Sequence, residues 1–68
     1  ENALKFLEAA ITEMPYDPTV NSHLGDVYWQ VGRKNEAKFQ WQRSLDNETD
    51  EPLKTALENK IKNGLLAR

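Results

Sequence analysis

The chain has 68 residues, of which 38% are apolar and 29% charged, and its formal net charge is −2. A chain this short buries only about 60% of the surface that it exposes when unfolded, so a large enzyme pocket is not expected. Because it has no cysteine, neither disulfides nor thiolate-bound zinc stabilise its core. The slightly acidic balance argues against a nucleic-acid partner, and no apolar run approaches the ~20 residues of a membrane span.

Residues 1–14 predict the first helix, because apolar residues recur there at the three- and four-residue spacing of one helical face. They are Ala3, Leu4, Leu7, Ala10, Ile11 and Met14. The second helix is predicted to begin at Pro18, behind the capping residue Asp17, and to stop at Gly32. Its apolar stripe consists of Val20, Leu24, Val27, Tyr28 and Val31.

A third helix is predicted after Gly32, and it fades into the polar run at residues 46–50. Its core face carries Ala37, Trp41, Ser44 and Leu45. The last helix begins near Pro52 and ends at Asn63-Gly64, and we expect Leu53, Leu57 and Ile61 to point inward. Because no segment alternates with period two, the fold class is all-α, with four short antiparallel helices joined by tight turns.

An internal repeat connects these helices, since an offset of 34 residues pairs Ala3 with Ala37 and Pro18 with Pro52. The residues Leu24-Gly25, Tyr28, Gly32, Ala37, Trp41 and Leu45 have the spacing of the tetratricopeptide repeat. The chain resembles this family. The resemblance implies an α-solenoid fragment, with the second half of a unit in residues 1–17, one complete helical hairpin in 18–51 and a capping helix in 52–68. We therefore expect the C-terminal end of a longer array.

The repeat spacing also gives expectations about packing. Gly25 and Ala37 are expected where the two helices of the hairpin cross, since close approach leaves no room for longer side chains. The chain departs from the family pattern at several positions, among them Asn21 and Ser44. The last segment departs most strongly, with Glu58, Asn59 and Lys62 at positions where the family has Leu, Gly and Tyr. A polar outer face is typical of a terminal capping helix.

The resemblance implies a protein-protein interaction scaffold that binds a peptide or a partner helix in a concave groove. The expected groove residues are Thr19, Ser22, His23, Asp26, Trp29 and Gln30. Trp29 is either a partner anchor or covered by the last helix, and Asp26 would repel the C-terminal carboxylate that well-known family members clamp. Two alternatives stay open: a purely structural cap of a longer array, and a regulatory array attached to an enzyme domain elsewhere.

Neither catalysis nor a cofactor is expected. His23 is the single imidazole, and Ser22 beside it points about 100° away on a helix, so no nucleophilic arrangement is recognisable. Asp46, Glu48 and Asp50 alternate as in a calcium loop, but the required Gly and bidentate Glu are missing. The sequence therefore predicts no enzyme, no metal site and an acidic turn that caps a helix.

The expected partner is a protein or peptide, with no nucleic acid and no membrane. Self-association through the uncovered face of the first helix, including Phe6, is a further expectation, and Phe39 is expected to be exposed on the convex side. Arg33, Lys34 and Lys38 form a basic group that is either a solvated turn or a contact for an acidic partner. We expect a soluble protein, and both cytoplasm and periplasm fit.

Overall fold

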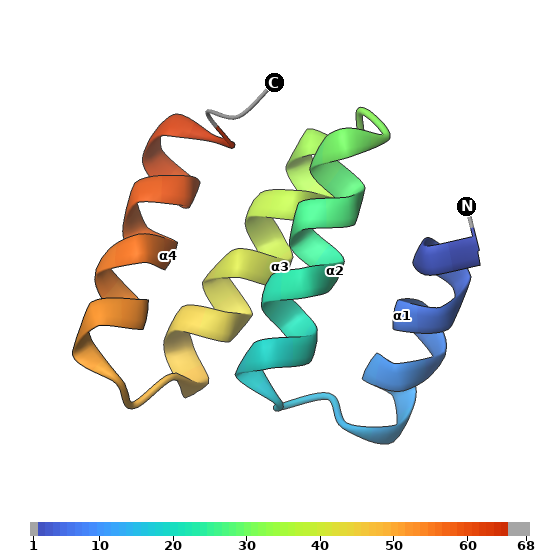
Figure 1. Ribbon diagram of the computed structural model, residues 1–68, viewed down its shortest axis with the longest axis horizontal. Coiled ribbons are helices and arrows are strands. Elements are labelled where there is room, and N and C mark those ends of the chain that lie inside the picture. Colours follow the sequence, from blue (N-terminus) through green and yellow to red (C-terminus); the bar gives the residue numbers. More distant parts are fainter. Residues whose placement is uncertain (1, 66–68) are drawn as a thin grey trace.

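The computed structural model describes residues 2–65, which form four α-helices. They are α1 (Asn2–Glu13), α2 (Pro18–Gln30), α3 (Lys34–Asn47) and α4 (Glu51–Asn63). Each helix runs antiparallel to the one before it, and each packs on its neighbours in chain order, so that α2 and α3 form the centre (Figure 1). The Cα atoms span 29 × 27 × 16 Å, a thin slab. The all-α prediction is confirmed, with no strand in residues 2–65.

The helix ends are set by local capping, as predicted. The Asp17 carboxylate accepts hydrogen bonds from the backbone N–H groups of Thr19 at 2.9 Å and Val20 at 3.2 Å. Asp50 accepts one from the N–H of Leu53 at 3.1 Å. At the opposite ends, Gly32 and Gly64 have φ angles of 90° and 75°, a left-handed conformation in which a side chain is strained. The chain leaves its helical path at these glycines, after α2 and α4.

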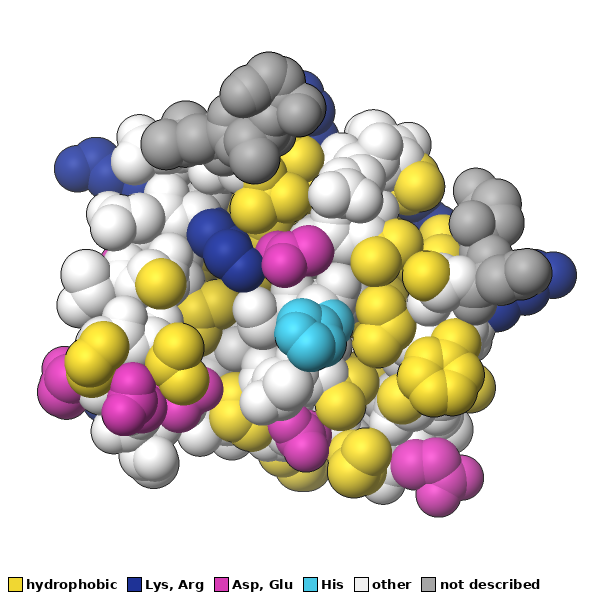
Figure 2. Space-filling model, in the orientation of Figure 1, with side chains coloured by type: hydrophobic (Ala, Val, Ile, Leu, Met, Phe, Trp, Pro, Cys, Tyr) yellow, Lys and Arg dark blue, Asp and Glu magenta, His cyan; other side chains and the backbone are white. Residues whose placement is uncertain are grey.

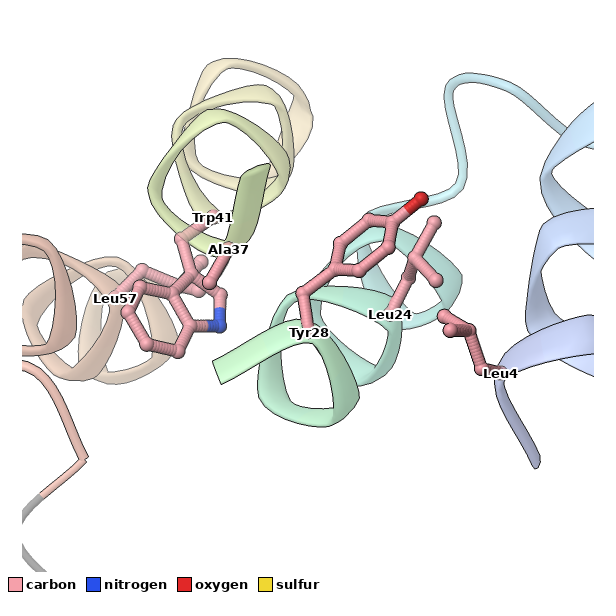
Figure 3. Close-up of a cluster of buried hydrophobic side chains, with 6 residues drawn as sticks. All are labelled: Leu4, Leu24, Tyr28, Ala37, Trp41 and Leu57. Atoms are coloured by element: carbon pink, nitrogen blue, oxygen red, sulfur yellow. The ribbon is translucent and has the colours of Figure 1, made fainter. Parts of the chain in front are cut away.

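The central pair, α2 and α3, crosses at Gly25, which confirms the predicted close approach. A Cβ atom placed on Gly25 would lie 2.5 Å from Cδ1 of Trp41 and 3.0 Å from the carbonyl oxygen of Ala37. Trp41 and Ala37 are both fully buried. Figure 3 shows how the Trp41 ring fills the space between α3 and α4, while Tyr28 and Leu24 point from α2 toward Leu4 of α1.

Two polar residues that depart from the family pattern are buried and anchor the turn before α2. The Ser44 hydroxyl donates to the carbonyl of Pro18 at 2.7 Å. The Asn21 side-chain amide donates to the carbonyl of Pro15 at 3.3 Å, and the Arg43 guanidinium donates to the same oxygen at 3.1 Å. Asn21 and Arg43 thus hold the turn at Pro15, and Ser44 connects α3 to the first residue of α2.

The flank at α1 combines aliphatic contact with one long-range hydrogen bond. The Tyr28 hydroxyl donates to the Glu8 carboxylate at 2.9 Å. Burial of the ring, together with this hydrogen bond to a carboxylate, raises the pKa of Tyr28 above its ordinary value. Three predicted stripe residues are wrong, since Met14 and Val31 are 47% and 41% exposed and Ala3 is also exposed. Met14 and Val31 follow the last residue of their helix, so they no longer share its buried face, and Ala3 lies about 100° around α1 from the buried Leu4.

Two aromatic residues that were expected at the surface are exposed. Phe6 on α1 is 73% exposed and Phe39 on α3 is 58% exposed. Among helices α1 to α4, none is both long enough and apolar enough to cross a membrane.

Candidate functional site

A pocket of about 160 Å³ opens between α2 and α4. Small-molecule sites usually measure roughly 300–1,000 Å³, so this pocket suits a single side chain of a partner better. Figure 2 looks onto this face, where the one histidine (cyan) lies near the centre. The lining residues come from α2, from α4 and from the end of α3 with the turn that follows it: Pro18, Thr19, Ser22, His23, Ser44, Glu48, Leu53, Ala56, Leu57 and Lys60.

An ion pair beside the pocket connects α4 to α2. The Lys60 ammonium lies 2.9 Å from Oδ1 of Asp26, and it also donates to the Ser22 hydroxyl at 3.3 Å. The same Asp26 oxygen accepts a hydrogen bond from Nε1 of Trp41 at 2.9 Å. The Asp26 and Lys60 side chains are 32% and 25% exposed. One carboxylate therefore joins α2, α3 and α4, and its charge is neutralised by Lys60.

Trp29, which the sequence left either as a partner anchor or as a covered residue, lies against the end of α4. Its ring is half-buried and lies 5.5 Å from the ring of Trp41. A Cβ atom on Gly64 would collide with the Trp29 ring, so the end of α4 lies directly against it. The Lys34 ammonium lies 4.9 Å from the ring centroid. Trp29 is thus partly covered by the end of α4, and these contacts favour a packing role over that of a partner anchor.

The six expected groove residues divide into two groups. Thr19 and His23 are exposed and Ser22 is half-buried, and all three line the pocket. The other three, Asp26, Trp29 and Gln30, lie outside its lining, although Gln30 is exposed.

Sequence reasoning missed the contribution of α4 to the pocket. Leu53 was expected to point inward, but it is 52% exposed and lines the pocket. This expectation is wrong because Leu53, in the first turn of α4, borders the open pocket and lies outside the buried core cluster. Lys60 carried a detectable signal, since it lies one 34-residue period after the oppositely charged Asp26.

The acidic turn before α4 is a capping structure, as predicted. One Glu48 carboxylate oxygen accepts hydrogen bonds from the N–H groups of Thr49 and Asp50, each at 3.1 Å. In the part of the chain that the structure describes, no three acidic or histidine side chains are grouped closely enough to hold a metal ion.

The basic group after α2 is partly engaged inside the molecule. The Arg33 guanidinium pairs with Glu36 at 3.3 Å and lies 4.6 Å from the Tyr28 ring centroid. Lys34 covers Trp29 as described above, so two of its three members have intramolecular contacts.

No protein-family model, curated protein or solved structure matches this chain.

Proposed function

We propose that this chain is a protein-interaction module of the tetratricopeptide type, in which the groove between α2 and α4 holds a segment of a partner protein. The observation that carries the proposal is the solvent-open pocket with the exposed residues His23 and Leu53 in its lining. The spacing of Gly25, Ala37 and Trp41 and the helix crossing that they form are consistent with the repeat type.

A polypeptide suits the chemistry of this groove. Its volume of about 160 Å³ accommodates one anchoring side chain. The hydroxyl groups of Thr19 and Ser22 and the imidazole of His23 offer hydrogen-bonding groups for a partner backbone. Leu53 and Ala56 add apolar surface beside them. An apolar anchor surrounded by polar groups is the usual composition of a protein interface.

A site-specific photo-crosslinker tests this proposal. Placed at His23, it should capture a partner in extracts of the source cells, and excess unlabelled chain should compete for that partner. The matched control carries the same crosslinker at Phe39, which is also exposed but belongs to α3 and does not line the pocket. Capture of the same partners at both positions, or at Phe39 alone, would contradict a binding site in the groove.

The second candidate is a structural cap, favoured by the contacts that α4 makes along α2. The Lys60 to Asp26 ion pair and the contact of Gly64 with Trp29 seal one edge of the central helix pair. Replacing Leu53, which is exposed and lines the pocket, by serine separates the two functions. Unchanged partner capture by the folded variant supports the cap, whereas an intact fold with lost capture supports the groove.

A further inference from the structure

We infer that the partner segment presents one aliphatic side chain to the pocket with a lysine or arginine directly after it. This inference rests on the proposed function, because it specifies the chemistry of the occupant of the same groove. It follows from the balance of charges around the pocket and from the position of the exposed apolar residues.

Counted together with Asp26, which pairs with Lys60, the residues around the pocket carry a net negative charge at neutral pH. Two lining residues, Glu48 and Lys60, are formally charged. The ammonium of Lys60 is already neutralised by Asp26 at 2.9 Å. Glu48 accepts two backbone hydrogen bonds but forms no ion pair within residues 2–65. A partner cation is therefore the group that would complete the electrostatics of this site.

The surroundings of Glu48 extend the negative charge. Residues 46–51 contain four acidic side chains and no basic one. Glu51 alone among them forms an ion pair, with Lys54 at 3.7 Å. At the lower left of Figure 2, over the start of α4, acidic side chains lie beside hydrophobic ones. A phosphate-rich partner would be repelled here, whereas a lysine or arginine side chain would be attracted.

The apolar part of the site lies close to this charge. Leu53 is 52% exposed, Ala56 is exposed and Leu57 is buried, and all three line the pocket together with Glu48. An aliphatic side chain in the pocket would contact Leu53 and Leu57. A basic residue next in the partner chain would then be close enough to Glu48 to form an ion pair.

Two capped eight-residue peptides test the inference. One carries a single leucine followed by two lysines in a Gly/Ser background, and the other carries two glutamates in place of the lysines. Titration of the whole chain, monitored by calorimetry at low salt, should show that the lysine peptide binds at least about tenfold more tightly than the glutamate peptide. Raising the salt concentration should reduce this difference.

Matched variants locate the charge. Glu48→Gln keeps an oxygen for the Thr49 and Asp50 N–H groups but removes the charge, and it should weaken binding of the lysine peptide about two- to fivefold. Asp46→Asn removes a charge from the same acidic turn but lies outside the pocket lining, where Asp46 accepts a hydrogen bond from Gln42 at 3.0 Å. It should change binding less than Glu48→Gln. Melting curves confirm that both variants fold.

A third variant separates this inference from the proposed function. Ala56→Trp fills the pocket from α4 and should abolish binding of both peptides. If the two peptides bind equally to the wild-type chain and Ala56→Trp abolishes both, the charge inference is overturned while the groove stands. If the lysine peptide binds equally well to the folded Ala56→Trp variant, the groove itself is wrong. Failure of the lysine peptide to bind the wild-type chain also overturns the inference.

Discussion

The contact between α2 and α3 and the contact between α2 and α4 are built on different physics. At the first, Gly25 allows the Trp41 ring to approach so closely that a single added methyl group would clash. At the second, Lys60 reaches across to Asp26, and an open pocket of about 160 Å³ remains beside it. Steric fit fixes the contact between α2 and α3, whereas a charged side chain connects α4 to α2 and leaves a pocket open between them.

Substitutions in the contact between α2 and α3 should have the largest effect on the free energy of unfolding. Trp41→Ala should cost about 3–5 kcal/mol, because it removes the largest fully buried side chain and leaves a cavity. A core of this size rarely supplies more than about 3–5 kcal/mol in total, so we expect the variant to lose its helical circular dichroism at 25 °C. Phe39→Ala on the same helix is the control and should change stability by less than about 0.5 kcal/mol. Equal effects would contradict the assignment of the core.

A smaller loss of stability is expected when a side-chain atom is added to the contact between α2 and α3. Gly25→Ala places a methyl group against the buried Trp41 ring and should cost about 1–3 kcal/mol, even though alanine favours helix formation. The melting midpoint should fall by about 4–8 °C per kcal/mol. Gln30→Ala, at an exposed position of α2, serves as the control. An unchanged midpoint for Gly25→Ala would show that the helices do not cross there.

The ion pair between Lys60 of α4 and Asp26 of α2 should contribute less to stability. In a double-mutant cycle with Lys60→Met and Asp26→Asn, the coupling between the two residues should be about 0.2–1 kcal/mol, since both side chains are partly solvated. High salt should reduce the coupling. Denaturant unfolding provides the measurement. If the two single effects simply add, the ion pair does not hold α4 to α2.

The smallest effect on stability is expected at alkaline pH, where Tyr28 of α2 contacts α1. Because the pKa of Tyr28 is raised in the folded state, the unfolded chain loses this proton first as the pH increases. The contribution of Tyr28 is therefore fully present below about pH 10 and is lost as the pH rises through the higher folded-state pKa. The melting midpoint of Tyr28→Phe should fall less than that of the wild type between about pH 9 and about pH 11. Identical pH profiles would show that Tyr28 ionises in the folded state as it does in the unfolded chain.

Most of the helical architecture could be predicted, because its determinants are local. Asp17 and Asp50 cap helices within three residues of themselves, and Gly32 and Gly64 end them through their own φ angles. The close approach of α2 and α3 at Gly25 could also be predicted, because the repeat spacing places the small residues Gly25 and Ala37 where the two helices cross.

The groove could be predicted only in part, because it depends on side chains from helices that are distant in sequence. Leu53 is exposed beside the open pocket, and Trp29 is partly covered where the chain passes it at Gly64. The pair of Asp26 and Lys60 was detectable in principle. In a repeat, parallel helices place residues one period apart at the same height, so opposite charges 34 residues apart predict a contact.

Amide chemical shifts test most directly the proposal that a partner segment binds in the groove between α2 and α4. A ¹⁵N-labelled chain titrated with the leucine-lysine peptide should show its largest shift changes at Thr19, His23, Leu53 and Ala56. Changes centred on Phe6 of α1 or on Phe39 of α3, or no change at saturating peptide, would contradict the claim.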